Sequence, residues 1–89
     1  MRVEHIWFSP ESIEAIQAEM RRAIDKHGIE ETPLVQDDAG SLPILVEELG
    51  EVAKAMTYDN GDRAKLAAEL LQTAAMALAW RQRLVETPL

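Results

Sequence analysis

Residues 66–80 read LAAELLQTAAMALAW, and Glu69 is the only charged side chain in this stretch. A helix that is apolar on nearly all sides is buried on nearly all sides. We therefore expect a largely buried helix over about residues 62–84. The alanines of this stretch permit close contact with a neighbouring helix, including a helix from a partner subunit.

The residues at the start of the chain predict a first helix over about 10–27. Ser9 suits the N-cap and Pro10 suits the first helical position, while Gly28 is typical of a helix end. Between them, large apolar residues recur at spacings of three and four, as on the buried face of a helix. These residues are Ile13, Ile16, Met20 and Ile24.

Residues 28–40 read GIEETPLVQDDAG, with a proline, two glycines and acidic pairs but no helical period. We expect a loop over 28–41, which is either a lid over a site or an acidic connector between antiparallel helices. A second helix is expected over about 42–57, followed by a turn at the sequence YDNG of residues 58–61. Its predicted buried stripe consists of Leu45, Leu49, Val52 and Met56.

The composition limits how large a core the chain can form. Of its 89 residues, 47% are hydrophobic, but 13 of these are alanine and only four residues are aromatic. With no cysteine there is no disulfide to make up for a small core. We predict a single all-α domain over residues 1–89, an antiparallel bundle of about three main helices that is completed by oligomerisation as a homodimer or homotetramer.

The charge of the chain restricts its partners. Sixteen acidic and nine basic residues give a net charge of −7, which opposes binding to a nucleic-acid polymer. A nucleotide can still bind if a divalent cation bridges the two sets of negative charge. The start, MRVEHIWFSPES, lacks the apolar core of a secretory signal and no stretch has the length of a membrane span, so we expect a cytoplasmic protein without membrane contact.

The second helix carries an acidic cluster within VEELGEVAKA, residues 46–55. Glu47, Glu48 and Glu51 fall within about 100° of one another on the helix, where each like-charge pair costs some tenths of a kcal/mol. Glu69 on the third helix has an apolar setting, so it must be protonated, paired with a cation such as Lys65, or bound to a metal.

Packing the second helix against the third would bring these four carboxylates together, more than Lys54 and Lys65 can balance. An oxygen-preferring divalent cation resolves this conflict, and Mg²⁺ fits because it accepts a few carboxylates and keeps phosphate in its shell; Mn²⁺ takes similar ligands. The alternative is a solvated acidic face, with Glu69 paired to an arginine or lysine.

The run of residues 47–51, followed by Glu69 on the next helix, resembles the EExxE…ExxD pattern of the MazG-like all-α nucleoside triphosphate pyrophosphohydrolases. The similarity extends over about residues 16–84 and is greatest to the short, stand-alone phage and actinobacterial members. It implies Mg²⁺-dependent cleavage of a nucleoside triphosphate to the monophosphate and pyrophosphate by attack of water.

The resemblance also implies roles for individual residues. The metal ligands would be Glu48, Glu51, Glu69 and Gln72. Glu47 would be a second-metal ligand or the base that orients the water, and Lys54 would meet a phosphate oxygen. The tryptophans Trp7 and Trp80 would lie in the core or an interface, or stack on a base.

Gln72 departs from the family pattern, which has aspartate at this position. A glutamine oxygen can bind Mg²⁺ but brings no charge, so we expect a weaker metal site. The alternative function is therefore a non-catalytic helical dimer that has kept the fold and binds a nucleotide or a protein partner.

Overall fold

The computed structural model describes residues 7–58 and 60–86, and these residues form helices without any strand. The predicted all-α class with three main helices is thus confirmed. The elements are α1 (Pro10–His27), a short 3-10 helix η1 (Ile29–Glu31), α2 (Asp38–Thr57) and α3 (Arg63–Glu86). None of the helices in the described part is both long and apolar enough to cross a membrane.

The helix α1 begins and ends where the sequence predicts. The Ser9 side chain accepts a hydrogen bond of 3.1 Å from the backbone N–H of Ser12, which satisfies one of the free donors at the helix start. At the other end, Gly28 adopts a φ of 88°, and its N–H donates to the Ile24 carbonyl at 2.8 Å. A residue with a side chain adopts this φ only with strain, so glycine is what allows the chain to leave the helix here.

The helix α2 begins at Asp38, so the predicted start near residue 42 is wrong. Asp37 is the N-cap, since its Oδ1 accepts a 2.8 Å hydrogen bond from the N–H of Gly40, and Asp38 follows in the first turn. The acidic pair therefore belongs to a helix start, where negative side chains meet the positive end of the helix dipole. Pro43 lies inside the helix and does not mark its beginning.

The predicted loop is correspondingly shorter, and it is packed against the helices. Thr32 and Pro33 of this segment are fully buried, as is Ser41 just inside α2. Within the segment, the Thr32 hydroxyl donates to the Ile29 carbonyl at 2.8 Å, and the Gln36 amide donates to the Glu30 carbonyl at 2.8 Å. The segment between α1 and α2 is thus held by its own hydrogen bonds and forms part of the folded body.

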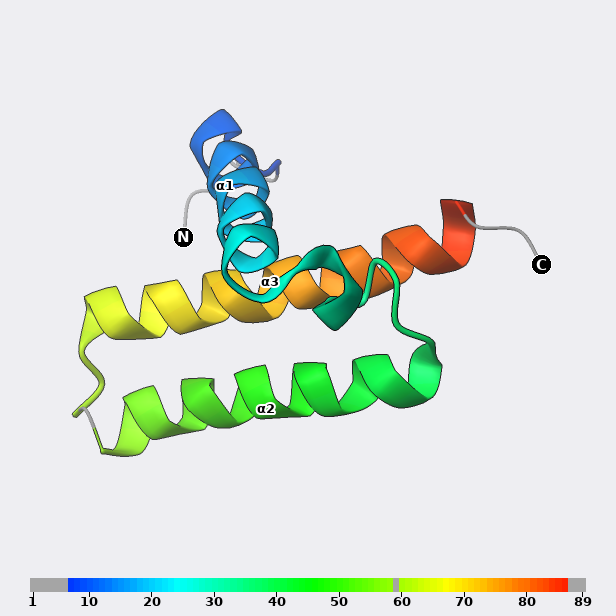
Figure 1. Ribbon diagram of the computed structural model, residues 1–89. Helices are drawn as coiled ribbons and strands as arrows, with labels where there is room; N and C mark the ends of the chain where they lie inside the picture. Colours follow the sequence, from blue (N-terminus) through cyan, green and yellow to red (C-terminus); the bar gives the residue numbers. More distant parts are fainter. Residues whose placement is uncertain (1–6, 59, 87–89) are drawn as a thin grey trace.

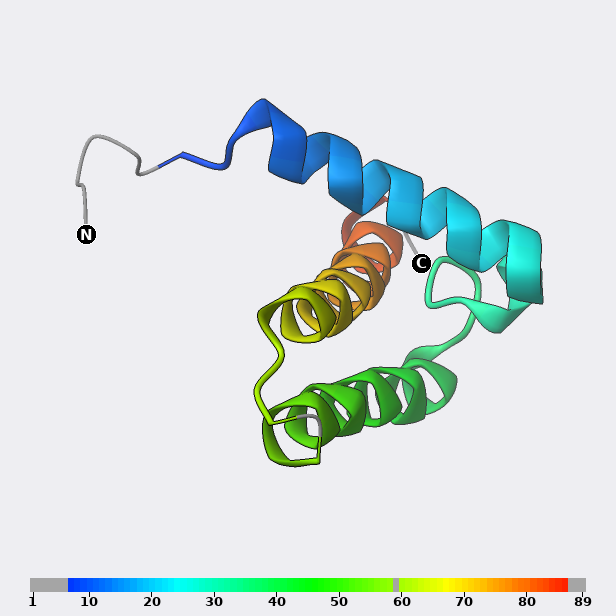
Figure 2. The ribbon, with the colours of Figure 1, turned by 90° about the vertical axis from the view of Figure 1, so that its left-hand side faces the viewer.

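Helices α2 and α3 lie side by side and are connected by a short turn (Figure 1). Asn60 and Gly61 have positive φ values of 57° and 68°, as the Asn-Gly pair predicts, whereas Asp59 lies outside the described residues. Asp62 caps α3, because its Oδ1 accepts from the N–H groups of Ala64 and Lys65. Helix α1 packs on α3 and crosses it at a steep angle (Figure 2).

The core of the described chain is small. Its buried apolar residues are Ala23, Val52, Ala55, Ala75, Met76 and Ala79. The expectation that α3 is buried on nearly all sides is wrong for the single chain, since Leu70 and Leu78 are 49% and 46% exposed. The expected stripe of α2 is also wrong in part, because Leu49 and Met56 are 57% and 61% exposed. The physical reason is that α1 crosses α3 and does not run along it, so three helices leave much apolar surface open.

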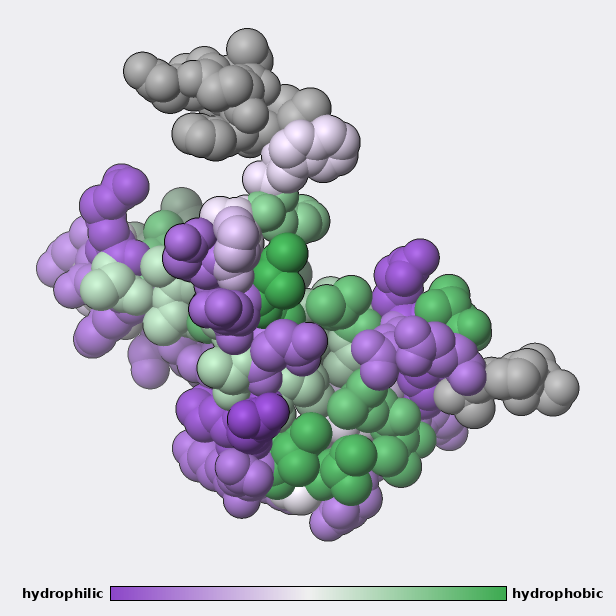
Figure 3. Space-filling model, turned by 90° about the horizontal axis from the view of Figure 1, so that it is seen from above, coloured by the Kyte–Doolittle hydropathy of each residue, from purple (hydrophilic) through white to green (hydrophobic). Residues whose placement is uncertain are grey.

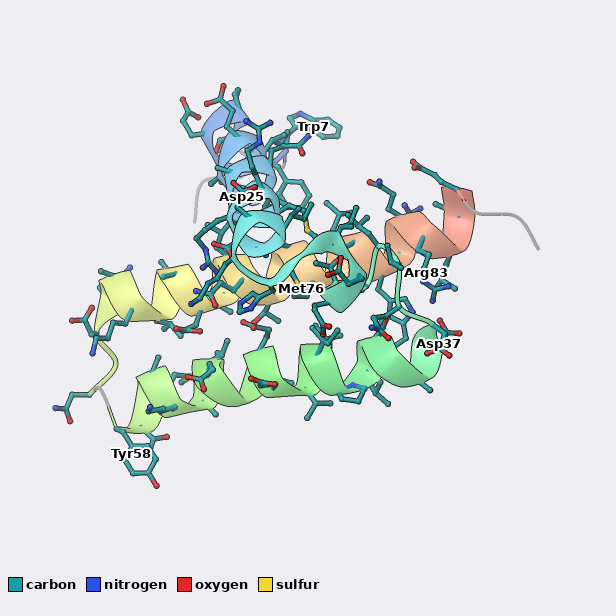
Figure 4. All side chains as sticks on the ribbon, in the orientation of Figure 1. Trp7, Asp25, Asp37, Tyr58, Met76 and Arg83 are labelled. Atoms are coloured by element: carbon teal, nitrogen blue, oxygen red, sulfur yellow. The ribbon has the colours of Figure 1, made fainter. Side chains whose placement is uncertain are left out.

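A second contact joins the start of α2 to the end of α3. The Asp38 carboxylate accepts a 2.8 Å hydrogen bond from the Trp80 indole and a further one from the Arg83 guanidinium. Arg83 accordingly lies over the first turn of α2, near Asp37 (Figure 4). The Trp80 hydrogen bond, followed by that of Arg83, holds the pKa of Asp38 below its ordinary value. This contact fixes the ends of the two helices against each other.

Replacing Asp37 with alanine should remove the cap of α2 and lower the free energy of unfolding by about 0.5–2 kcal/mol. Thermal unfolding followed by circular dichroism would measure the change. The control is Asp25→Ala, which removes the same charge from an exposed position in the last turn of α1 without removing a cap. Equal melting temperatures of the wild type and Asp37→Ala would contradict the role of Asp37.

Candidate functional site

A cavity of about 610 Å³ opens between the three helices. Helices α2 and α3 line it with Ile44, Glu47, Glu48, Glu51, Glu69, Gln72 and Met76. Helix α1 and the segment after it line it with Glu19, Arg22, Ala23, Lys26, His27, Glu31 and Thr32. Met76, which is labelled in Figure 4, marks the α3 wall beneath the end of α1.

The cavity brings together the four glutamates and the glutamine that the sequence singles out. On α2, positions 44, 47, 48 and 51 share one side because they are separated by three or four residues, and positions 69, 72 and 76 do the same on α3. Since α2 and α3 pack side by side, these two faces meet. The packing therefore concentrates negative charge around one open cavity.

Three residues with expected substrate roles lie elsewhere. Lys54 is exposed, and the cavity lining does not include it. Trp7 is 80% exposed and lies at the far end of α1 (Figure 4), and Trp80 is bound to Asp38. Among the residues that the structure describes, those that line the cavity do not include any of these three.

The environment of Glu48 in the cavity disfavours its charged form. Burial raises the pKa of its carboxyl group, and the nearby charges of Glu69, Glu47, Glu19 and Glu51 raise it further. Its Oε2 is buried and has no hydrogen-bond partner among the described residues, and the same holds for Oε2 of Glu69. A buried carboxylate oxygen without a partner is costly, so both atoms would gain from a cation or a proton.

The donor atoms are those that Mg²⁺ and Mn²⁺ prefer, namely carboxylate and amide oxygens. In the described part of the chain, however, no group of three or more histidine, cysteine, aspartate or glutamate side chains is arranged to hold a metal ion. The chemistry of the cavity thus suits a divalent cation, and binding would require the glutamate side chains to rotate towards one point.

Helix α1 supplies polar residues that the sequence reasoning missed. Arg22 binds Glu19 through two hydrogen bonds, from Nε at 2.8 Å and from Nη2 at 2.7 Å. The hydrogen bond to Glu19, followed by the charges of Glu19, Glu48 and Glu69, raises the pKa of the guanidinium above its ordinary value. Lys26 and His27 lie one turn further along the same side. The spacing of residues 19, 22 and 26 was a usable signal, because it places them on one helical face.

Comparison of the chain with models of known protein families, with characterised proteins and with solved structures finds no match. The functional argument therefore depends on the side chains of the cavity. Their arrangement offers carboxylate and amide oxygens on the α2 and α3 side, and both basic groups and the carboxylates of Glu19 and Glu31 on the α1 side.

Replacing Glu48 with glutamine should stabilise the protein at pH 7 in the presence of EDTA. Each like-charge contact that is removed is worth roughly 0.2–0.5 kcal/mol, and 1 kcal/mol corresponds to about 4–8 °C in a domain of this size, so an increase of a few degrees is expected. Thermal unfolding of the variant and the wild type would measure it.

The gain should depend on pH in a defined direction. The pKa of Glu48 is raised in the folded state, so its charge costs stability above the folded pKa, and this cost disappears as the pH falls through that value towards the unfolded one. The advantage of Glu48→Gln should therefore shrink on acidification. Glu14→Gln, at an exposed position of α1, is the matched control and should change little. A less stable Glu48→Gln protein at pH 7 would contradict the charge repulsion.

Proposed function

We propose that the protein is a Mg²⁺-dependent nucleoside triphosphate pyrophosphohydrolase of the MazG-like kind, which hydrolyses (d)NTP to (d)NMP and pyrophosphate. One observation carries the proposal: Glu47, Glu48, Glu51, Glu69 and Gln72, from two helices, line a single cavity. The volume of about 610 Å³ lies within the range of roughly 300–1,000 Å³ that is usual for small-molecule sites.

The metal ligands in this proposal are Glu48, Glu51, Glu69 and Gln72. The unpartnered buried oxygens of Glu48 and Glu69 support the assignment, because they lack the positive partner that such atoms require. A bound Mg²⁺, or Mn²⁺ in its place, would neutralise phosphate charge and make a neighbouring water more acidic. The negative charge of the cavity would then favour a nucleotide only together with its cation.

Glu47 is proposed to act on the attacking water. It lines the cavity and is exposed, so its carboxylate can accept a hydrogen bond from water and exchange the proton with solvent. As the water oxygen forms a bond to the α phosphorus, the anhydride bond between the α and β phosphates breaks. Glu47 takes the proton of the water, and pyrophosphate leaves with the electron pair of the broken bond.

The assay for this proposal measures pyrophosphate release from a panel of NTPs and dNTPs with and without Mg²⁺. We expect turnover only with the cation, and a loss of at least about a hundredfold in Glu48→Gln and in Glu69→Gln, as is typical when a group essential to catalysis is removed. Glu14→Gln should retain full activity. Lack of turnover with every substrate, or full activity in Glu48→Gln, would exclude the proposal.

Gln72→Asp tests the weakest ligand of the set. The added charge should tighten Mg²⁺ binding by about tenfold, or roughly 1.4 kcal/mol, in a calorimetric titration. Unchanged affinity would remove Gln72 from the ligand set. Nucleotide binding without hydrolysis in both proteins would favour the non-catalytic helical dimer.

We also propose that the chain forms a homodimer or homotetramer, in which helices of the partner complete an antiparallel bundle. The exposed apolar side of α2 supports this, because Leu42, Val46, Leu49 and Met56 repeat at spacings of three, four and seven. Figure 3, which looks down from the side of α1, shows apolar residues gathered on part of a different face. A continuous apolar stripe of this kind is typical of a contact between subunits.

Val46→Lys should shift the protein from dimer or tetramer towards monomer in size-exclusion chromatography with light scattering, because a charge would enter the contact. Ala18→Lys places the same charge on the exposed side of α1 and should leave the oligomer intact. A monomeric wild type, or an unchanged Val46→Lys oligomer, would contradict this arrangement.

A further inference from the structure

Helix α1 gives the cavity a basic side that a metal site alone does not need. Arg22, Lys26 and His27 line the cavity from the last two turns of α1, where Glu19 pairs with Arg22, and the glutamates of α2 and α3 line it from the other helices. A cavity for a bare cation would be served by the carboxylates only. Basic and acidic groups around one space suit a ligand that carries both an anion and a cation, such as a phosphate chain with its Mg²⁺.

Arg22 is held in place and still accessible. Its Nε and one Nη2 hydrogen donate to Glu19, whose side chain is 9% exposed, while the Arg22 side chain is 47% exposed. A guanidinium carries five N–H donors, so these two bonds leave three for a ligand. Glu19 thus fixes the orientation of the Arg22 guanidinium. Donors that are already fixed bind phosphate oxygens with a smaller loss of side-chain entropy.

Lys26 lies four residues after Arg22 and therefore on the same side of α1. Its flexible ammonium group complements the planar guanidinium of Arg22. The ammonium can adjust its position to one phosphate oxygen, whereas the guanidinium can bind two phosphate oxygens at once. Across the cavity from the two positive charges lie the four glutamates of α2 and α3, Glu47, Glu48, Glu51 and Glu69. The two positive charges reduce the repulsion that an entering polyphosphate would meet.

We propose that Arg22 and Lys26 bind the phosphate chain of the substrate on the side opposite the metal ligands, and that Glu19 positions Arg22 for this contact. This inference rests on the proposed function and names its phosphate-binding residues. It moves that role from Lys54, which is exposed outside the cavity, to α1. The chemical class of the ligand is a linear polyphosphate, whichever base and sugar it carries.

The test uses calorimetric titration of the full chain, first with Mg²⁺ alone and then with inorganic tripolyphosphate in saturating Mg²⁺. Arg22→Gln/Lys26→Gln should weaken tripolyphosphate binding by at least tenfold. Its Mg²⁺ affinity should stay the same or increase, because positive charge is removed from the cavity. Arg21→Gln is the matched control, since Arg21 is exposed on the neighbouring position of α1 and does not line the cavity; it should bind both ligands as the wild type does.

The loss of Arg22 leaves Glu19 without its partner and could impair folding. Glu19→Gln/Arg22→Gln replaces the ion pair with two neutral amides, and thermal unfolding shows whether it folds. This variant should also lose tripolyphosphate affinity, which would separate the contact from a purely structural role of the pair.

Each outcome has a distinct meaning. The inference is wrong if Arg22→Gln/Lys26→Gln and Glu19→Gln/Arg22→Gln both bind tripolyphosphate as tightly as the wild type. The Mg²⁺ titration and the hydrolysis assay test the proposed function separately. If the wild type binds tripolyphosphate equally without Mg²⁺ and only the Arg22 variants lose it, the anion site stands and the metal-dependent function fails. If the wild type binds no tripolyphosphate, the inference is wrong.

Discussion

The contact between α2 and α3 is the constraint on which the rest of the structure depends, because it brings carboxylates of two helices into one cavity. Like charges that are brought together raise the free energy of the folded state. Two features show this repulsion, the raised pKa of Glu48 and the unpartnered buried oxygens of Glu48 and Glu69. The caps of α2 and α3 stabilise each helix, and the contact of Asp38 with Trp80 and Arg83 holds the two helices together against this repulsion. Relief of this repulsion is the physical basis of the proposed metal site.

The small core explains why so much apolar surface stays open. Alanines fill the contact between α3 and its neighbours, which allows close approach but buries little area for each residue. Because α1 crosses α3, its basic end reaches the cavity while large residues on α2 and α3 remain uncovered. The same crossing thus leads to two proposals, a phosphate contact on α1 and a subunit contact on α2.

Much of the site could be predicted from the sequence, because helical spacing alone puts residues 47, 48 and 51 on one side of α2 and residues 69 and 72 on one side of α3. The spacing of three or four residues is a local property that survives any packing arrangement. The start of α2 was harder to predict, since glycine and proline normally interrupt helices, and here the Asp37 cap acts together with the tertiary contacts of Asp38 with Trp80 and Arg83.

The sequence by itself determined the helical class, the bounds of α1 and the residues that each helix can offer to a site, because these depend on local periodicity and capping. Only the tertiary structure decided which helix completes the cavity. Arg22 and Lys26 of α1 line it, whereas Lys54 of α2 does not. The crossing angle of α1 depends on contacts among residues far apart in the chain. No spacing within a single helix encodes that angle, so both the basic side of the cavity and the open apolar stripe of α2 emerge only when the helices are packed.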